Sequence, residues 1–495
     1  MTRGLPPLDS TLSLGIFSRY RLPLPDTRKD LNTVTSPPVQ PADNTLSRSL
    51  LPRHMFMITI GGIIGAGLFV SSSAAIATAG PAVIISYMLT GILLLLVMRM
   101  LGEMAVSLPE VRSFTEFARV GLGDWAGFSV GWLYWFFWAV VIPIEAIAGA
   151  NILQELGLTL PTWQTGCLLM VIMTGVNLMS ARSFGEFEFW FSSIKVSAII
   201  AFILVSAAHV FGLFGEAGPG LSNLTEHGGF APKGGLAVLA AVTTVIFSMM
   251  GTEVVTIAAA ESSEPAKAVA RMTSSIIGRI MLFYVGSLSM IVAVVPWNTI
   301  VPGQSPFTAA LDVMQIPLAS TIMSFVILTA VLSCLNSCYY VCSRVLFVLA
   351  EKGDAPRWLV KLNVRRVPSR SVILGSVAGF VGVGAQLYSP NGVFAFLVNA
   401  SGALIVVIYL SMAISHVRLR RRAHAEGREP VLKMWLFPWL SYLSIVAMTG
   451  VLIAMALTPG LESQFWTSAL SVAVALAAYG VVAASRARTA VLAAD

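Results

Sequence analysis

The sequence predicts an all-helical protein that crosses a membrane many times, and three observations support this fold class. Of the 495 residues, 56% are apolar and 11% are charged, and the mean hydropathy is +0.81, whereas a soluble domain carries about 25% charged residues. Apolar stretches of about 20 residues, the length that crosses a hydrocarbon core, recur from His54 to the end of the chain. Basic residues gather on one side of these stretches. We therefore expect one membrane domain.

Apolar segments of spanning length follow one another through residues 54–486, and residues 1–53 and 487–495 form the two tails. Residues 1–53 are rich in Pro, Ser and Thr and hold no continuous apolar run, which predicts a disordered tail and no cleavable signal peptide. The twelve predicted spans are 55–79, 82–107, 125–156, 162–180, 185–209, 235–261, 273–296, 319–350, 369–388, 392–416, 434–457 and 463–485.

The distribution of Lys and Arg predicts that both termini are cytoplasmic, because basic residues are retained on that side of the membrane. With this orientation only Lys233 falls in an outer loop. The net charge of +7 is thereby explained, and nucleic acid is not an expected partner. Residues 108–125 are too polar to span and favour a short interfacial helix. The cytoplasmic basic residues include Arg112, Arg119, Lys267, Arg271, Arg357 to Arg370, Arg418 to Lys433, Arg486 and Arg488.

Two predicted spans have centres that are poor helix. Residues 61–69 read GGIIGAGLF, and residues 247–256 read FSMMGTEVVT with Gly251 in mid-segment; each Gly costs about 1 kcal/mol relative to Ala inside a helix. Unwound backbone is tolerated at membrane depth only where it lines a cavity, so both breaks indicate a site. For the first break, a helix-packing face built on Gly61 and Gly65 is an equal alternative.

The two breaks together predict a binding site for a zwitterion. The half-helix after the first break presents N–H groups that suit a carboxylate, and the carbonyls that end the preceding half-helices suit an ammonium. The breaks open the first and sixth segments, so residues 54–209 and 235–416 each form a unit of five helices. An odd number of helices inverts the second unit, as in inverted-repeat transporters, with 434–485 as two additional helices.

Few ionisable residues lie within the predicted spans, where a charge is a functional hypothesis by default. Lys195 either extends to the interface or is buried beside the first break, where it could exchange a proton and act as the coupling group. Glu253 follows the second break and could hold an ammonium, fix the unwound backbone, or pair with a basic residue. Glu103, Glu145 and Glu261 lie nearer to segment ends, and we expect only supporting roles.

Other polar and aromatic residues favour structural roles. Glu186 and Glu188 fit carboxylates at a helix start, and the aromatic run WLYWFFW at 132–138 fits an interfacial belt. Phe247 could close over a ligand as a lid. Three of the four cysteines lie on one helix face without nearby His or carboxylate ligands, so we expect packing residues, neither disulfides nor a metal site. They are Cys334, Cys338 and Cys342.

Seven ordered blocks resemble the bacterial amino acid transporter family within the amino acid, polyamine and organocation permeases. The resemblance covers about residues 50–450, and the segments 131–146 and 255–262 are most similar to the γ-aminobutyrate permease group. The blocks are GGIIGAGLFV at 61–70, AGPAVIISY at 79–87, MLGEMAV at 100–106, FGEFEFWFSSIKV at 184–196, GTEVVTIAAAES at 251–262, SCLNSCYYVCSR at 333–344 and EKGDAP at 351–356.

The resemblance implies a LeuT-like fold in the cytoplasmic membrane and proton-coupled import of a small neutral amino acid, γ-aminobutyrate first, with no cofactor besides the proton. It implies a proton-responsive role for Lys195 and maps family acidic positions onto Glu103, Glu253 and Glu261. Ala66 replaces a hydroxyl residue of some relatives and leaves only N–H donors. The implied carboxylate contacts are Gly65, Ala66 and Gly67, and the implied amino-group contacts are Phe247, Ser248 and Gly251.

Several functions remain open at this stage. The substrate could instead be alanine, glycine, serine, or an aromatic or basic amino acid, and the protein could be an exchanger. A membrane amino acid sensor without net transport is the main rival from another class. We find no HExxH sequence, no nucleophile with a base partner and no phosphate-binding loop, so an enzyme is not expected. The oligomeric state is not determined by the sequence.

Overall fold

We describe a computed structural model of the chain, in which residues 44–495 form one compact unit. It describes residues 57, 64–111, 113–179, 181–213, 218–249, 251, 253, 278, 280–389, 393, 397, 401, 403–457 and 462–492, without the side chains of 114, 181–184, 464 and 490–492. The predictions for residues 1–53, for Gly61 and Gly62 and for Glu261 lie outside this part of the chain.

Every regular element in the described ranges is a helix. The longer helices follow the predicted spans closely, because each apolar run ends at polar or glycine-containing sequence. The main helices are α2 (Ser72–Ala79), α3 (Val83–Ser107), α4 (Phe114–Leu122), α5 (Asp124–Glu155), α6 (Thr162–Met179), α7 (Ala181–Val210), α8 (Gly234–Met249), α12 (Ser287–Val294), α13 (Pro306–Val313), α14 (Ala319–Glu351), α15 (Ser369–Gly384), α17 (Leu404–Ala425), α18 (Trp439–Leu457) and α19 (Glu462–Leu492).

Short π-helical and 3-10 segments join or extend these helices. The π-helical segments η2 (Gly67–Ser71) and η5 (Ile280–Gly286) lead directly into α2 and α12. Pro81 and Gly80, whose φ is 66°, form the turn between α2 and α3. The 3-10 segments are η3 (Gly80–Ala82), η4 (Ser222–Leu224), η6 (Trp297–Thr299), η7 (Arg357–Val360) and η8 (Ala385–Leu387).

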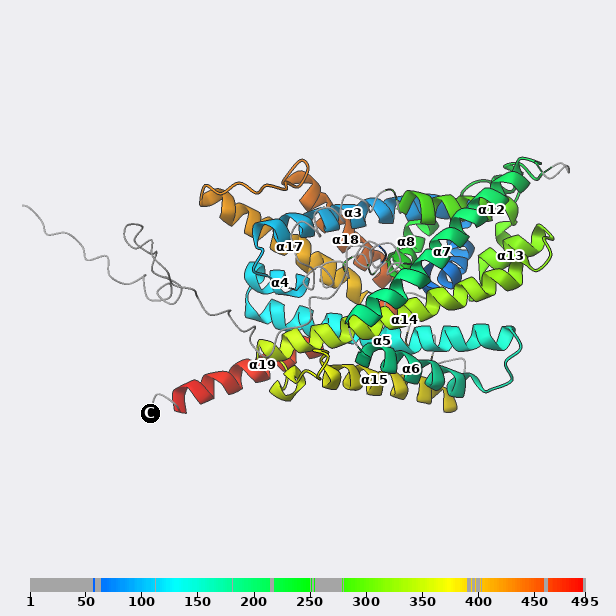
Figure 1. The fold of residues 1–495 in the computed structure, drawn as a ribbon. Coiled ribbons are helices and arrows are strands. Elements are labelled where there is room, and N and C mark those ends of the chain that lie inside the picture. Colours follow the sequence, from blue (N-terminus) through cyan, green and yellow to red (C-terminus); the bar gives the residue numbers. More distant parts are fainter. Residues whose placement is uncertain are drawn as a thin grey trace, which may run out of the picture. The chain divides into compact units, whose positions relative to one another are not determined.

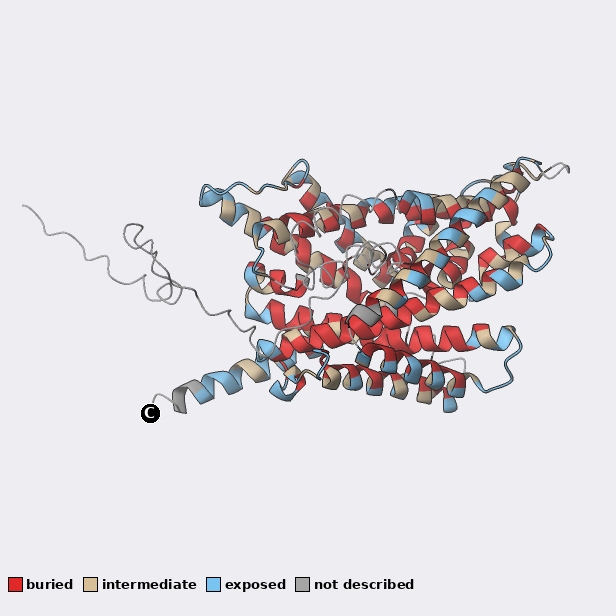
Figure 2. Cartoon of the chain, viewed as in Figure 1, coloured by how far each residue is buried: buried red, intermediate tan, exposed pale blue. Residues whose placement is uncertain are grey.

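Eight helical stretches among the described residues are long and apolar enough to cross a membrane. The apolar window of α5 is 83% buried within the protein, whereas the window at 465–489 in α19 is 11% buried. Figure 2 shows the same contrast between a buried interior and outer helices with exposed faces. Since these exposed faces carry large apolar residues such as Leu204, Val446 and Leu470, hydrocarbon is their natural solvent.

The helices α5 and α14 pack along each other and form the centre of the unit (Figure 1). On one side α6 and α15 contact them, and α7 packs against α14. On the other side α17 packs against α3, α4, α5 and α18, and α8 packs against α2 and α3. This arrangement brings the ends of η2 and α8 into the same buried region as the middle of α5.

The structure corrects two details and confirms a third. The prediction of an interfacial aromatic belt at 132–138 is wrong for Tyr134, Phe137 and Trp138, which are at most 1% exposed, because α5 is the central helix. The last helix continues to Leu492, beyond the predicted end at 485. The short helix expected within 108–125 is confirmed as α4, and its location at the membrane interface stays a prediction.

Candidate functional site

Described residues at each of the two predicted breaks are not α-helical, and residues 58–63 and 254–277, which flank them, lie outside the described part of the chain. Ile64 and Gly65 are not helical, and helix begins immediately after them; the Gly65 carbonyl accepts the N–H groups of Leu68 and Phe69. At the second break α8 ends at Met249, and Gly251 has a φ of 99°. A φ of this sign suits glycine, which explains why α-helix does not continue through this position.

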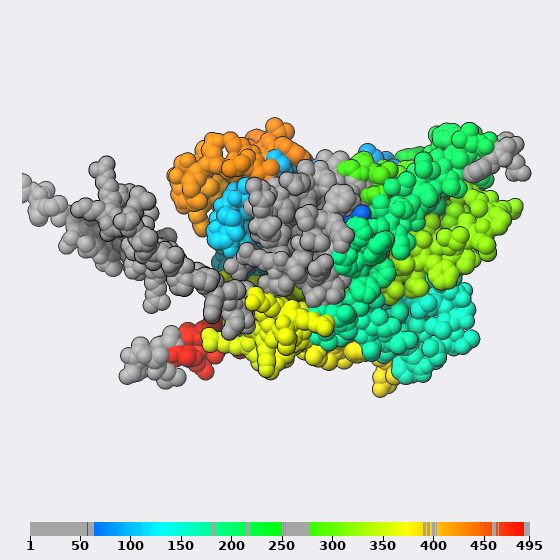
Figure 3. Space-filling model, in the orientation of Figure 1, coloured from blue at the N-terminus to red at the C-terminus, as the bar shows by residue number. Residues whose placement is uncertain are grey.

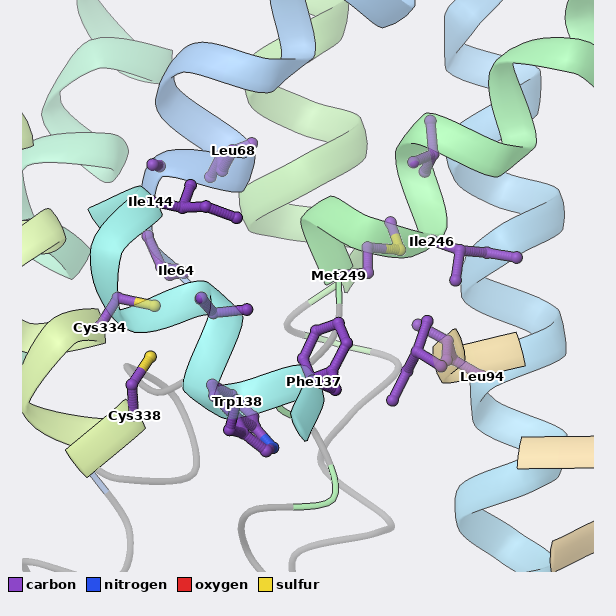
Figure 4. Close-up of a cluster of buried hydrophobic side chains, with 14 of the residues drawn as sticks. Ile64, Leu68, Leu94, Phe137, Trp138, Ile144, Ile246, Met249, Cys334 and Cys338 are labelled. Atoms are coloured by element: carbon purple, nitrogen blue, oxygen red, sulfur yellow. The ribbon is translucent and has the colours of Figure 1, made fainter. Parts of the chain in front are cut away.

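The two breaks lie against each other, and glycine makes this approach possible. A Cβ atom at Gly67 would lie 2.6 Å from the Cα atom of Ser248, and one at Gly65 would lie 2.9 Å from the Cβ atom of Cys334. Gly65 and Gly67 therefore lie in close contact with α14 and α8. The alternative of a packing face built on Gly61 and Gly65 stays a prediction, because Gly61 lies outside the described residues. Figure 4 shows Ile64 and Leu68 beside side chains of α5 and α14, with Met249 across from them.

Lys195 is buried beside the first break, so the alternative in which it extends to the interface is wrong. Its side chain is fully buried on α7. The Nζ atom donates to the carbonyl of Ile64 at 2.9 Å and to the Oγ atom of Ser333 at 2.8 Å. One side chain thus connects the unwound backbone of the first break to α14.

Glu188 completes this cluster, which corrects its interpretation as a helix-start carboxylate. Glu188 is fully buried, and its Oε1 atom lies 3.8 Å from Lys195 Nζ. Ser333 Oγ donates to the same oxygen at 2.7 Å, and Ser192 Oγ donates to it at 3.0 Å. The sequence did carry a signal, because Glu188, Ser192 and Lys195 are spaced i, i+4 and i+7 on one helix face.

Glu145 belongs to the first break, although its position in the sequence indicated only a supporting role. It is 3% exposed in the middle of α5. Its carboxyl group lies beside the N–H of Ala66 and the thiol of Cys334, and its Oε1 atom would lie 3.4 Å from a Cβ atom at Gly65. Its Oε2 atom is buried and has no hydrogen-bond partner among the described residues. A carboxyl group of the protein therefore lies next to a backbone N–H group at the start of the half-helix.

Glu253 fixes the backbone of the second break. Its Oε2 atom accepts the N–H of Gly251 at 3.1 Å and the hydroxyl of Tyr409 at 2.5 Å. Its Oε1 atom accepts the hydroxyl of Tyr134 at 3.1 Å. The backbone-fixing alternative for Glu253 is thus observed. Tyr134 and Tyr409 come from α5 and α17, and sequence reasoning had assigned neither to the site.

The other predicted residues divide between the breaks and a distant cluster. The carbonyl of Ser248 accepts the hydroxyl of Tyr284 at 3.1 Å, and Phe247 is half-buried beside it. Glu103 pairs instead with Arg420 at 2.5 Å and with His416 at 3.2 Å on α17. The structure therefore does not bring Glu103 to either break.

The cysteines behave as packing residues. All four are free, and Cys334, Cys338 and Cys342 are buried along α14. The described residues contain no group of three or more His, Cys, Asp or Glu side chains suited to a metal ion.

Comparison with known proteins agrees with this geometry. Residues 54–488 match the amino acid permease family. A γ-aminobutyric acid permease of Bacillus subtilis (strain 168) is 46% identical over 436 residues, which cover 88% of this chain and 93% of the relative. The γ-aminobutyric acid permease of Escherichia coli (strain K12) is 44% identical over 429 residues, 86% of this chain and 92% of the relative.

More distant similarities extend over the same part of the chain. An aromatic amino acid transport protein, AroP, of Corynebacterium glutamicum is 38% identical over 430 residues, covering 86% of this chain and 93% of the relative. Among solved structures, a manganese transporter of Eremococcus coleocola has a TM-score of 0.56 at 13% identity, and the match covers 88% of this chain and 97% of that chain. This second likeness concerns the fold alone.

A bundle of long helices with apolar outer faces, together with these relatives, defines a multi-pass membrane transporter. The chain belongs to the amino acid permease family, and its substrate is an amino acid.

Proposed function

We propose that this permease imports γ-aminobutyrate together with a proton across the cytoplasmic membrane, with both termini in the cytoplasm. The 46% identity to a γ-aminobutyric acid permease over 88% of the chain carries the choice of substrate. The distribution of basic residues supports the orientation. The proposed topology has twelve spans, in which two inverted five-helix units each begin with an interrupted helix and two further helices follow.

The proposed substrate site lies where the two breaks meet. The substrate carboxylate would bind the N–H groups at Gly65, Ala66 and Gly67, where the half-helix N-terminus favours an anion. The ammonium would bind carbonyl groups near Phe247, Ser248 and Gly251, at the C-terminal end of α8. The close approach of Gly67 to Ser248 supports this assignment, because it places the backbone of the proposed carboxylate contacts next to the backbone of the proposed ammonium contacts.

Lys195 is the proposed coupling group. As an ammonium it donates to the Ile64 carbonyl and to Ser333, so it holds the first break against α14. Loss of its proton would remove its charge and weaken both hydrogen bonds, because bonds to charged groups are about twice as strong as neutral ones. The first break would then be free to move relative to α14 and to expose the site to the other side.

Glu145 adds a second link between the proton and the substrate. An ionised Glu145 carboxylate at Ala66 would repel the substrate carboxylate at the same donor, because both anions would lie in a site of low dielectric constant. Protonated Glu145 would instead donate to the substrate through its Oε2 atom, which has no hydrogen-bond partner in the described part of the chain. Binding of the substrate would therefore require that Glu145 take up a proton.

Replacement Glu145→Gln tests this link. The amide cannot ionise, so we expect γ-aminobutyrate affinity that no longer falls as the pH rises, whereas wild-type affinity falls. Binding to purified protein by calorimetry between pH 5 and pH 8 measures the effect. An affinity in Glu145→Gln that keeps the wild-type pH profile would show that Glu145 only packs against Ala66.

Transport by proteoliposomes tests the function as a whole. We expect a proton gradient to drive accumulation of labelled γ-aminobutyrate, and addition of γ-aminobutyrate to acidify the lumen. A panel of unlabelled alanine, glycine, serine, aromatic and basic amino acids should compete poorly. Stronger competition by an aromatic amino acid would overturn the choice of substrate, and uptake that needs an internal amino acid instead of a gradient would show an exchanger.

A further inference from the structure

A cavity that is separate from the two breaks lies at one end of the bundle. It has a volume of about 510 Å³ and is enclosed by the end of α3, by α4, by the end of α17 and by residues 428–431. Figure 3 shows the segment around residues 420–440 projecting at the molecular surface above α4, which it contacts through α17. None of the residues assigned to the substrate contacts above lines this cavity, although Glu103 does.

The lining is basic. Arg420, Arg422 and Arg428 contribute guanidinium groups, and His416 lies at the inner end. These arginines belong to the stretch 418–433, which holds six Arg or Lys residues against two Glu. Basic clusters that directly follow a membrane span attract anionic lipid headgroups, and basic pockets between spans bind such headgroups directly.

The two acidic residues that line the cavity are already neutralised. Glu103 is paired with Arg420 and His416 and also accepts the N–H of Met434 at 2.5 Å. Glu429 is exposed and pairs with Lys433, whose hydrogen bond and charge lower the pKa of that carboxyl group. Among the described residues Arg422 has no ion-pair partner, so its guanidinium is available to an added anion.

Apolar surface lies next to the basic lining. Met104, Leu108, Val120 and Val431 line the cavity itself. Beyond residue 433 the chain enters α18 through Trp435, Leu436 and Trp439, which are 44%, 74% and 75% exposed. Exposed tryptophans at the start of a span are typical of the interface between headgroups and acyl chains. The basic lining of the cavity therefore suits an anionic headgroup, and the neighbouring apolar surface suits the acyl chains attached to it.

We propose that this cavity binds the phosphate headgroup of an anionic phospholipid, with its acyl chains along the exposed face of α18. Arginine suits this ligand because its planar guanidinium makes paired hydrogen bonds to phosphate oxygens. The bound lipid would connect α3, α4 and α17, which close the cavity. The inference depends on the membrane location of the protein and is independent of which amino acid it carries.

Native mass spectrometry of the full-length protein in neutral detergent tests the proposal. We expect one phosphatidylglycerol molecule to bind with at least about tenfold preference over phosphatidylcholine. The double replacement Arg422→Gln with Arg428→Gln should weaken phosphatidylglycerol binding about 20-fold. Each basic residue near an anionic headgroup contributes a similar share of the binding free energy, so the losses from the two arginines multiply in the dissociation constant.

The same helix offers a matched control. Arg418→Gln with Arg421→Gln removes the same charge from the same basic stretch, but neither residue lines the cavity. This control should change phosphatidylglycerol binding less than about twofold. Arg422→Lys should give an intermediate affinity, because lysine keeps the charge and loses the paired geometry. Thermal unfolding in detergent without lipid should give the same midpoint for both double variants.

Three outcomes would overturn the proposal. Equal weakening by the two double variants would show attraction to the basic stretch alone. Equal binding of phosphatidylglycerol and phosphatidylcholine would show that no anion is recognised. Displacement of the lipid by millimolar sodium phosphate, with phosphate itself retained by the protein, would show a site for a free anion. Because none of these measurements uses transport, their failure is distinguishable from failure of the proposed import of γ-aminobutyrate.

Discussion

The two breaks are stabilised by different kinds of group. At the first, the Ile64 carbonyl is held by Lys195 of α7 and the Ala66 N–H by Glu145 of α5. At the second, the Gly251 N–H is held by Glu253, which lies two residues further along the same chain segment. In the proposed mechanism, a change of proton occupancy on another helix would release the first break, whereas the group that holds the second break belongs to the break itself. This difference indicates a movable first break and a fixed second break.

The side chains around the two breaks also differ in charge. Lys195 and Glu188 form a buried ion pair bridged by the hydroxyl of Ser333, so a proton could pass between charged groups. Glu253 is surrounded instead by the hydroxyls of Tyr134 and Tyr409. Tyrosine hydroxyls stay protonated at physiological pH, and they anchor the second break to α5 and α17.

The largest effect is expected where the two breaks touch. Replacement Gly67→Leu must separate η2 from α8, because even a Cβ atom would lie 2.6 Å from Ser248 Cα. We expect loss of γ-aminobutyrate binding and a lower thermal midpoint, consistent with an overpacking cost of about 1–3 kcal/mol or more. Gly175→Leu is the control, because a Cβ atom there meets nothing within 4 Å. Normal γ-aminobutyrate binding and a normal thermal midpoint in Gly67→Leu would show that transport does not depend on the contact between the two breaks.

Lys195→Met should separate coupling from binding. We expect loss of accumulation driven by a pH gradient, with exchange of internal for external substrate partly retained, measured in membrane vesicles. The variant leaves Glu188 buried without its ion-pair partner, which costs about 3–5 kcal/mol. Adding Glu188→Gln should restore the thermal midpoint without restoring accumulation. Unchanged concentrative uptake in Lys195→Met would exclude Lys195 as the coupling group.

Glu253→Gln tests whether the second break is independent of the proton. The amide oxygen can still accept the Gly251 N–H, but one tyrosine hydroxyl loses its charged acceptor, so we expect a loss of stability of about 1–3 kcal/mol. Proton-driven accumulation should persist at a reduced rate. If accumulation disappears while exchange survives, the second break is also part of proton coupling, and the proposed contrast is wrong.

Tyr409→Phe should have the smallest effect. It removes one hydrogen bond to Glu253 and leaves the side-chain volume nearly unchanged. We expect a loss of stability of about 1.5 kcal/mol, the low end for a hydrogen bond to a charged group. The thermal midpoint should fall slightly and the dependence of uptake on external pH should stay as in the wild type. Tyr388→Phe is the matched control, since that side chain is 93% exposed. An altered pH dependence in Tyr409→Phe would contradict a fixed second break.

The sequence by itself determined the membrane class, most helix bounds and the position of both breaks. These features depend on local composition: an apolar run must be long enough to span, and clustered glycine weakens a helix wherever it occurs. The sequence also singled out Lys195, because a charge inside a span needs an explanation in any fold, but it left burial and extension to the interface as equal alternatives.

Only the tertiary structure decided which side chains hold each break. From the sequence, we interpreted Glu145 as a residue near a segment end, Glu188 as a helix-start carboxylate and Tyr134 as an interfacial residue. All three are buried against residues more than 60 positions away in the sequence. Glu103 read as a supporting residue and instead pairs with α17. In a span that is apolar on all sides, the residues do not mark which face meets another helix. The packing of α5, α7 and α14 makes that choice.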